Sequence, residues 1–257
     1  MPDTNHPIAR RTLIIFYVLD TSGSMQYDGK IGVLNETMRE TIEVLKDVAK
    51  DNADAEIKIA VLKFDSGAKW VKKPTFLEDM YWEDLQAGGL TDIGMALSEL
   101  NIRLSREQFM TGRTGLYTPV IIFMTDGYPT DDWEKSLNKI KSENKWFKAA
   151  TKIGFALGSD ADYETIGAIV GNSEAVVQTE DLEVFKKLIR FVSVRSSILN
   201  GTSKMAGAKN SGGDIVKAAF DEQNIENAYI PNGNIKDDEL EPEVEVTGDS
   251  EWDTSGW

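Results

Sequence analysis

Two apolar runs of this sequence each end in an aspartate, and hydroxyl side chains lie close by. In FYVLDTSGSM the run ends at Asp20 and is followed by Ser22 and Ser24, two residues apart, with a glycine between them. In TPVIIFMTDG the run ends at Asp126, and the segment AGGLTDIG carries Thr91. Carboxylate and hydroxyl oxygens are the hard donors that Mg²⁺ prefers, and Mn²⁺ or Ca²⁺ also accepts them. The candidate metal ligands are Asp20, Ser22, Ser24, Thr91 and Asp126.

Strands and helices that alternate along the chain are needed to bring these segments together. The segment 12–20, TLIIFYVLD, is continuously apolar and rich in β-branched residues, as expected for a strand buried on both faces. The segment 30–50 places apolar residues three or four apart, which predicts an amphipathic helix. The pattern continues with strands at 56–64, 68–73 (a short edge strand), 118–127, 151–158 and 174–180, and helices at 91–104, 131–144, 161–170 and 181–197.

This alternation predicts an α/β fold with a doubly wound, mostly parallel sheet flanked by helices. Ligands of such sheets bind at the carboxyl ends of the strands, near the point where the strand order reverses. If the strands that end at Asp20 and Asp126 are neighbours, their carboxylates face one cavity. We expect Thr91 or Asp92 to cap the helix that follows them.

Composition excludes several kinds of chemistry and of partner. The chain has no cysteine and a single histidine, His6, so thiol nucleophiles, disulfides and Cys-ligated zinc are excluded. Lys and Arg number 28 against 43 Asp and Glu, and the net charge of −15 disfavours nucleic acid and anionic membranes. No apolar run approaches the roughly 18 residues of a membrane span. We therefore expect a cytoplasmic location.

The last quarter of the chain differs in composition from the rest. We expect a single domain at residues 8–197 and a flexible, acidic C-terminal tail at 198–257, since residues 227–257 carry nine acidic side chains and one basic one. Within this tail, residues 210–225 could form one helix that docks on the domain or on a partner. Trp252 and Trp257 suggest a short linear motif with aromatic anchors, although chance composition would also place them there.

The two aspartate segments also allow other interpretations. Asp-Thr-Ser-Gly-Ser and Asp-Gly are good turn sequences, so each segment alone could be purely structural. A strand-ending aspartate followed by threonine also suits phosphatases that form an aspartyl phosphate, but these need a second aspartate where Ser22 stands. A scaffold with a non-functional metal site is a third alternative. The segments offer no His or Lys as a general base, which favours metal-dependent binding over catalysis.

The motifs DTSGS, the threonine of GGLTDIG, and TDG resemble the metal-ion-dependent adhesion site (MIDAS) of von Willebrand factor A (VWA) domains, and the resemblance runs from about Arg11 to Ser197. It implies a Mg²⁺ site in which Ser22, Ser24 and Thr91 are direct or near-direct ligands. Asp20 and Asp126 would then bind mainly through water. It further implies a protein–protein interaction in which an acidic residue of the partner completes the coordination. One departure is Leu90, which stands where this family more often has glycine.

Two further stretches, FMTDGYPTDDW and VFKKLIRFVSVRSS, resemble the VWA proteins of bacterial tellurium-resistance clusters, the TerY type. This resemblance implies an intracellular adaptor in a tellurite or other stress-response or defence cluster. Its expected partners are a Ser/Thr kinase and a metal-dependent phosphatase of the PP2C type. The expected function is thus non-enzymatic.

Overall fold

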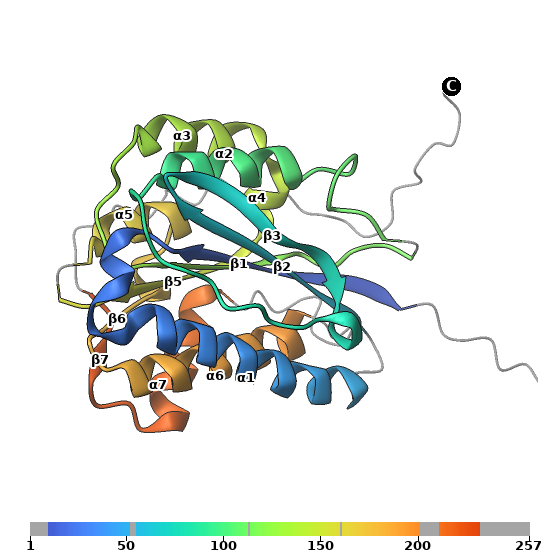
Figure 1. Cartoon of the computed structure of the whole chain (residues 1–257). Coiled ribbons are helices and arrows are strands. Elements are labelled where there is room, and N and C mark those ends of the chain that lie inside the picture. Colours follow the sequence, from blue (N-terminus) through green and yellow to red (C-terminus); the bar gives the residue numbers. More distant parts are fainter. Residues whose placement is uncertain (1–9, 52–54, 113, 160, 201–210, 232–257) are drawn as a thin grey trace, which may run out of the picture.

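A twisted sheet between two layers of helices forms the body of the protein (Figure 1). The computed structural model describes residues 10–51, 55–112, 114–159, 161–200 and 211–231. Within these residues the sheet has seven strands in the order β3-β2-β1-β4-β5-β6-β7. The strands are β1 (Arg11–Asp20), β2 (Ala55–Asp65), β3 (Gly67–Phe76), β4 (Val120–Thr125), β5 (Thr151–Leu157), β6 (Val176–Thr179) and β7 (Ala228–Tyr229).

The interior strands are parallel and the two edge strands are antiparallel to their neighbours. β1 pairs in parallel with both β2 and β4, and β5 and β6 continue the parallel set. β3 pairs antiparallel with β2, and β7 pairs antiparallel with β6. The predicted doubly wound, mostly parallel sheet is therefore confirmed. The edge strand β3 carries lysines and Pro74, which discourage pairing with another chain.

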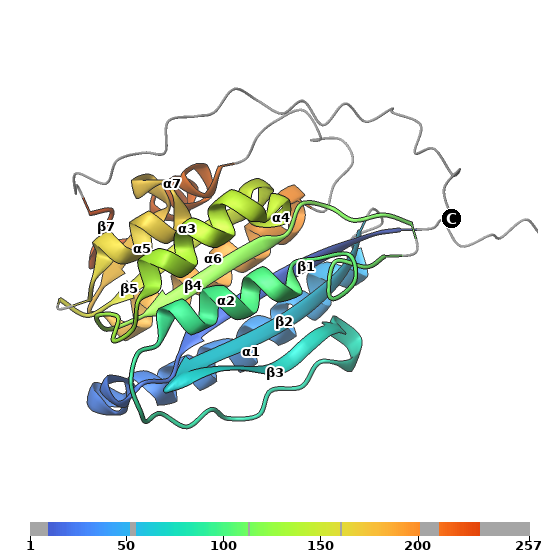
Figure 2. The same ribbon diagram turned by 90° about the horizontal axis from the view of Figure 1, so that it is seen from above.

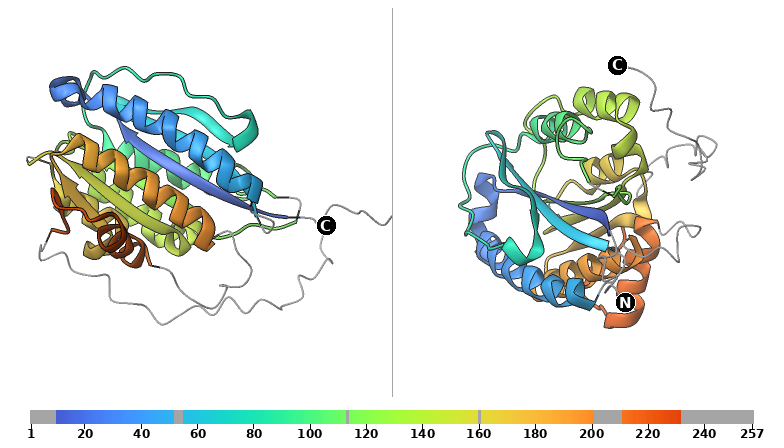
Figure 3. Two further views of the ribbon diagram at one scale, coloured as in Figure 1. Left: turned by 90° about the horizontal axis from the view of Figure 1, so that it is seen from below. Right: turned by 90° about the vertical axis from the view of Figure 1, so that its right-hand side faces the viewer.

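Helices cover both faces of the sheet (Figures 2 and 3). One face carries α1 (Lys30–Asp51), α6 (Leu182–Asn200) and α7 (Gly212–Gln223). The opposite face carries α2 (Ile93–Arg103), α3 (Trp133–Glu143), α4 (Lys145–Ala149) and α5 (Tyr163–Val170). Short 3₁₀ segments are η1 (Gly23–Gly29), η2 (Leu77–Asp79) and η3 (Ser173–Ala175).

β1 supplies apolar side chains to both cores, as its continuous apolar pattern predicts. Leu13, Ile15, Tyr17 and Leu19 point toward α1 and α6, while Ile14, Phe16 and Val18 point toward α2. The alternation is the period of two of a strand that is buried on both faces. Asp20 ends this central strand at the carboxyl ends of the parallel strands, and the chain then turns into η1.

Part of the expected tail belongs to the folded body. α6 continues to Asn200, α7 packs its buried residues Ile215, Val216 and Ala219 into the core with α6, and β7 adds a strand to the sheet. The helix considered for residues 210–225 thus forms, and it docks on the domain. α7 begins with a capping box in which Ser211 and Asp214 bond to each other's backbone. The remainder of the expected tail lies outside the described residues, as do His6, Trp252 and Trp257.

No helix of the described part of the chain is both long enough and apolar enough to cross a membrane.

Candidate functional site

The two aspartates that follow apolar strands lie side by side at the carboxyl ends of β1 and β4. In the register of β1 and β4, Leu19 pairs with Met124, so Asp20 and the residues just after β4 reach the same level. β1 has β2, the next strand along the chain, on one side and β4 on the other. The strand order therefore reverses between β1 and β4, and open α/β sheets bind ligands at such a point.

The carboxylate of Asp20 is buried and held on both oxygens. Oδ1 accepts a hydrogen bond from the backbone N–H of Ser22 at 2.7 Å, and Oδ2 accepts one from the hydroxyl of Thr125 at 2.5 Å. The residue has no exposed surface. Burial raises the pKa of Asp20 to about 6, against the lowering effect of the bonds from Thr125 and Ser22, and the nearby charge of Asp126 adds a smaller increase.

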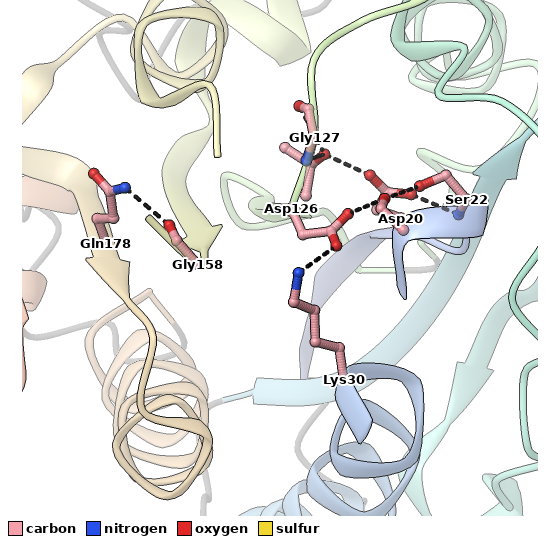
Figure 4. A network of polar contacts seen from close by, with 9 residues as sticks. Asp20, Ser22, Lys30, Asp126, Gly127, Gly158 and Gln178 are labelled. Carbon is pink, nitrogen blue, oxygen red and sulfur yellow. Dashed lines mark hydrogen bonds and ion pairs between the residues drawn. The ribbon is translucent and has the colours of Figure 1, made fainter. Parts of the chain in front are cut away.

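Hydrogen bonds join the side-chain oxygens of Ser22, Ser24 and Asp126 into a continuous chain. Asp20, Ser22 and Asp126 lie close together in Figure 4. The two serine hydroxyls are 3.0 Å apart, and Ser24 Oγ donates to Asp126 Oδ1 at 2.6 Å. Asp126 and Ser22 are both buried. Asp20 joins the chain through the backbone of Ser22.

Thr91 reaches the same place from a third loop. A Cβ built on Gly127 would lie 3.7 Å from Ser24 Oγ and 3.7 Å from Thr91 Oγ1, so both hydroxyls flank this glycine. The Thr91 loop and the loop after β4 are bonded to each other: Thr130 donates its N–H to Thr91 O at 3.0 Å and accepts from Thr91 N at 2.9 Å. The structure therefore brings all five predicted site residues together.

The cap of helix α2 corrects one expectation. Asp92 occupies the position before the helix but makes no side-chain cap bond. Instead, both carboxylate oxygens of Asp131 accept from the helix, from Gly94 N at 2.9 Å and Met95 N at 3.0 Å. Asp131 follows β4, so this cap joins the loop that carries Thr91 to the loop that carries Asp126.

Lys30 belongs to the site, although the sequence analysis placed no lysine there. Its Nζ lies 2.7 Å from Asp126 Oδ2, and the two side chains are 17% and 0% exposed. Gly158 borders the lysine, since a Cβ on this glycine would lie 3.7 Å from Lys30 Nζ. The side-chain amide of Gln178 donates a hydrogen bond to Gly158 O at 2.9 Å (Figure 4). Each carboxylate oxygen of Asp126 thus has one partner, Ser24 or Lys30.

Local geometry explains why sequence reasoning missed this lysine. The chain reverses between Ser24 and α1 through two successive residues of positive φ, Asp28 (54°) and Gly29 (73°). The reversal returns the first residue of α1 to the edge of the sheet. One sequence signal could have indicated this lysine: it is the first residue of the helix that follows the DTSGS loop. The connection between that loop and the helix is short, so the lysine stays close to the loop.

The oxygen set fits a small divalent cation. Mg²⁺ binds oxygens at about 2.0–2.1 Å in octahedral geometry, so neighbouring ligands are roughly 2.9 Å apart. The separations of 3.0 Å between the serine hydroxyls and 2.6 Å between Ser24 Oγ and Asp126 Oδ1 are close to that edge length. Among the described residues, no cluster of three or more His, Cys, Asp or Glu side chains could hold a metal ion. A metal at this edge would thus depend on hydroxyl ligands as well as carboxylates.

Comparisons with known proteins agree with this fold. Residues 15–129 match the family model described as von Willebrand factor type A domain. This stretch contains all three segments of the site. Over these residues the chain is therefore similar to von Willebrand factor type A domains. No curated protein sequence matches the chain.

Solved structures share the fold at low sequence identity. The von Willebrand factor type A protein from Catenulispora acidiphila is 18% identical, with a TM-score of 0.51 over 73% of this chain and 43% of that chain. The ArnB paralog VWA2 from Sulfolobus acidocaldarius is 14% identical, with a TM-score of 0.50 over 71% and 45%. Proximal thread matrix protein 1 from the mussel byssus, with a zinc-occupied MIDAS motif, is 20% identical, with a TM-score of 0.51 over 71% and 47%. The chain thus spans less than half the length of each of these proteins.

Proposed function

We propose that this protein is a binding module that captures a protein partner through a divalent cation. Asp20, Ser22, Ser24, Thr91 and Asp126 would hold the cation. The observation that carries the proposal is the convergence of two carboxylates and three hydroxyls from three loops, where the strand order reverses. Turn chemistry explains each loop separately, but it does not explain their convergence.

The composition of the site indicates what the partner contributes. Hydroxyl ligands are neutral, and Lys30 already offsets one of the two carboxylates, so a bound cation would keep much of its positive charge. A carboxylate of another protein is the natural further ligand. Mg²⁺ is the cation that we propose, with Mn²⁺ or Ca²⁺ as alternatives. The zinc-occupied MIDAS motif of the byssus protein supports a divalent cation in a protein of this fold.

Binding is favoured over catalysis by the state of Asp20. An aspartate nucleophile needs a free oxygen that faces the substrate, but both oxygens of Asp20 accept hydrogen bonds and the residue is fully buried. Ser22 stands where an aspartyl-phosphate enzyme needs its acid and base. Lys30 is an ammonium donor within an ion pair, and in that form it accepts no proton.

We further propose the cellular setting that the TerY-type resemblance implies. In this setting the protein is a cytoplasmic adaptor of a bacterial tellurium-resistance or related stress-response cluster. Its partners are a Ser/Thr kinase and a PP2C-type phosphatase, and neither nucleic acid nor membrane is a ligand. The support is the likeness of FMTDGYPTDDW and VFKKLIRFVSVRSS to that group.

Calorimetric titration of the full chain with MgCl₂ tests the proposed function. We expect saturable binding of one ion by the native chain and loss of that binding in Ser24→Ala, which removes one oxygen of the set. The control Ser142→Ala removes an exposed hydroxyl of α3 and should bind as the native chain does. Equal binding by both variants, or no binding of Mg²⁺, Mn²⁺ or Ca²⁺ by the native chain, would contradict the proposal.

A further inference from the structure

Exposed apolar side chains lie on the three segments that carry the candidate metal site. Among the described residues, eight large apolar side chains are exposed, and four of them belong to the segments that build the site. Tyr27 follows Ser24 in η1, Leu90 directly precedes Thr91, and Tyr128 lies two residues after Asp126. Met95 lies in the first turn of α2. We call this set the apolar collar: Tyr27, Leu90, Met95 and Tyr128.

Backbone bonds beneath the apolar collar fix the loops that carry it. Gly23 N donates to Gly89 O at 3.1 Å, and Gly88 N donates to Thr21 O at 2.8 Å, so the first and second loops are joined twice. The second and third loops are joined through Thr130 and Asp131, as described above. The exposed side chains therefore project from anchored backbone, which lowers the entropy lost when a partner binds.

The chemistry of this surface specifies its partner. The centre is polar and would require a carboxylate, whereas the collar offers tyrosine, leucine and methionine side chains that gain by burial. Tyrosine is among the residues that most often dominate the affinity of a protein interface. The net charge of −15 repels strongly acidic segments, so a run of acids is a poor partner.

On the basis of the proposed metal-dependent function, we propose that this surface recognises a protein segment in which a single carboxylate is flanked by apolar or aromatic residues. The carboxylate completes the cation's coordination, and its neighbours pack on the apolar collar. The metal supplies the dependence on divalent ions, and the collar supplies the selectivity among acidic segments. The occupant is a segment of a separate protein.

A displayed peptide library tests this inference. The full chain is immobilised with MgCl₂ and exposed to short random peptides that each carry one central glutamate. Bound peptides are then eluted with EDTA. A parallel library carries glutamine in place of the glutamate. We expect the EDTA-eluted peptides to come from the glutamate library and to be enriched in apolar and aromatic residues beside the acid.

Two matched pairs of variants assign the selectivity to the apolar collar. Tyr128→Ala is compared with Tyr81→Ala, since these side chains are 66% and 64% exposed and Tyr81 lies outside the site, against Lys72 of β3. Met95→Ser is compared with Ile102→Ser, two turns further along the same face of α2, at 48% and 55% exposure. We expect the collar variants to weaken binding of a selected peptide roughly tenfold while the controls leave it unchanged.

The outcomes separate this inference from the proposed function. An EDTA-eluted pool without apolar enrichment, or equal losses in collar and control variants, overturns the role of the collar and leaves metal-dependent binding intact. Absence of any EDTA-eluted peptide contradicts the proposed function itself. A synthetic peptide of residues 249–257, DSEWDTSGW, serves as a competitor. If it displaces the selected peptides at lower concentration than they displace each other, the occupant is this chain's own segment and the proposed separate partner is wrong.

Discussion

Replacing Asp20 by asparagine should stabilise the metal-free protein at neutral and alkaline pH. Burial raises the pKa of Asp20 from 3.8 to about 6, so the folded chain binds this proton more tightly than the unfolded chain does. As the pH rises from 3.8 through 6, the unfolded chain loses the proton first and the free energy of unfolding falls. Ionised Asp20 therefore destabilises the metal-free fold above its folded pKa.

The magnitude follows from the shift of the pKa. A difference of about two units at 1.36 kcal/mol each gives roughly 3 kcal/mol at pH 8, and the part lost between about pH 4.5 and pH 8 is roughly 2 kcal/mol. Asparagine is neutral at every pH and avoids this penalty. It keeps an oxygen that can accept from Ser22, although its amide fits the hydroxyl of Thr125 less well.

Urea unfolding in EDTA, at acidic and alkaline pH, measures the effect. The free energy of unfolding of Asp20→Asn minus that of the native chain should increase by about 2 kcal/mol from pH 4.5 to pH 8. The carboxylates that do not interact with Asp20 contribute equally to both chains and cancel in this difference. Saturating Mg²⁺ should then stabilise the native chain by about 2.7 kcal/mol at a hundred times its dissociation constant, and the variant much less. A difference between the chains that does not change with pH would refute the reasoning.

Three further changes test individual parts of the structure. Lys30→Met removes the ammonium group that occupies one carboxylate oxygen of Asp126, so calorimetry should show Mg²⁺ binding on the order of tenfold tighter. The control Lys46→Met, in the same helix, should leave Mg²⁺ affinity unchanged. An equal effect of both variants would reject the role of Lys30. Asp131→Ala removes two cap bonds of α2 and should lower the free energy of unfolding by about 1–2 kcal/mol in urea; unchanged stability would show that the cap contributes nothing. Gly212→Ala places a Cβ 2.1 Å from a carbonyl oxygen of β5 and should speed amide hydrogen exchange in α7. The control Gly32→Ala, whose Cβ would meet no atom within 4 Å, should leave this exchange unchanged. If the α7 amides of Gly212→Ala stay as protected as in the native chain, this packing is contradicted.

Periodicity predicted most of the fold because the main elements carry strong patterns. The strand at 12–20 and the helix at 30–50 were expected within one residue of β1 and α1, since one is apolar throughout and the other is amphipathic over many turns. Elements that depend on tertiary contacts were not predicted. β7 has two residues and exists through its pairing with β6, and α4 has five residues. The docking of α7 depends on close approach at Gly212, which composition does not reveal.

Part of the site was likewise predicted from sequence patterns, and part of it was not. Asp20 and Asp126 were predicted to lie together because both end strands of the same kind, and the sheet makes the two strands neighbours. Lys30 reaches the site through a reversal of the chain, and Asp131 caps α2 from the loop after β4. Neither contact follows from hydrophobic periodicity or from the three motif segments. The ligand roles of the predicted residues stay a prediction, as do the partners and the cellular setting.

The most direct measurement of the central claim is an anomalous difference map from crystals of the full chain grown with MnCl₂. Manganese replaces magnesium at oxygen sites and scatters anomalously, so its position is seen independently of the protein density. We expect one strong peak bordered by the hydroxyls of Ser22, Ser24 and Thr91. A map without a peak among these oxygens, from crystals in which manganese is bound elsewhere on the chain, would contradict the account.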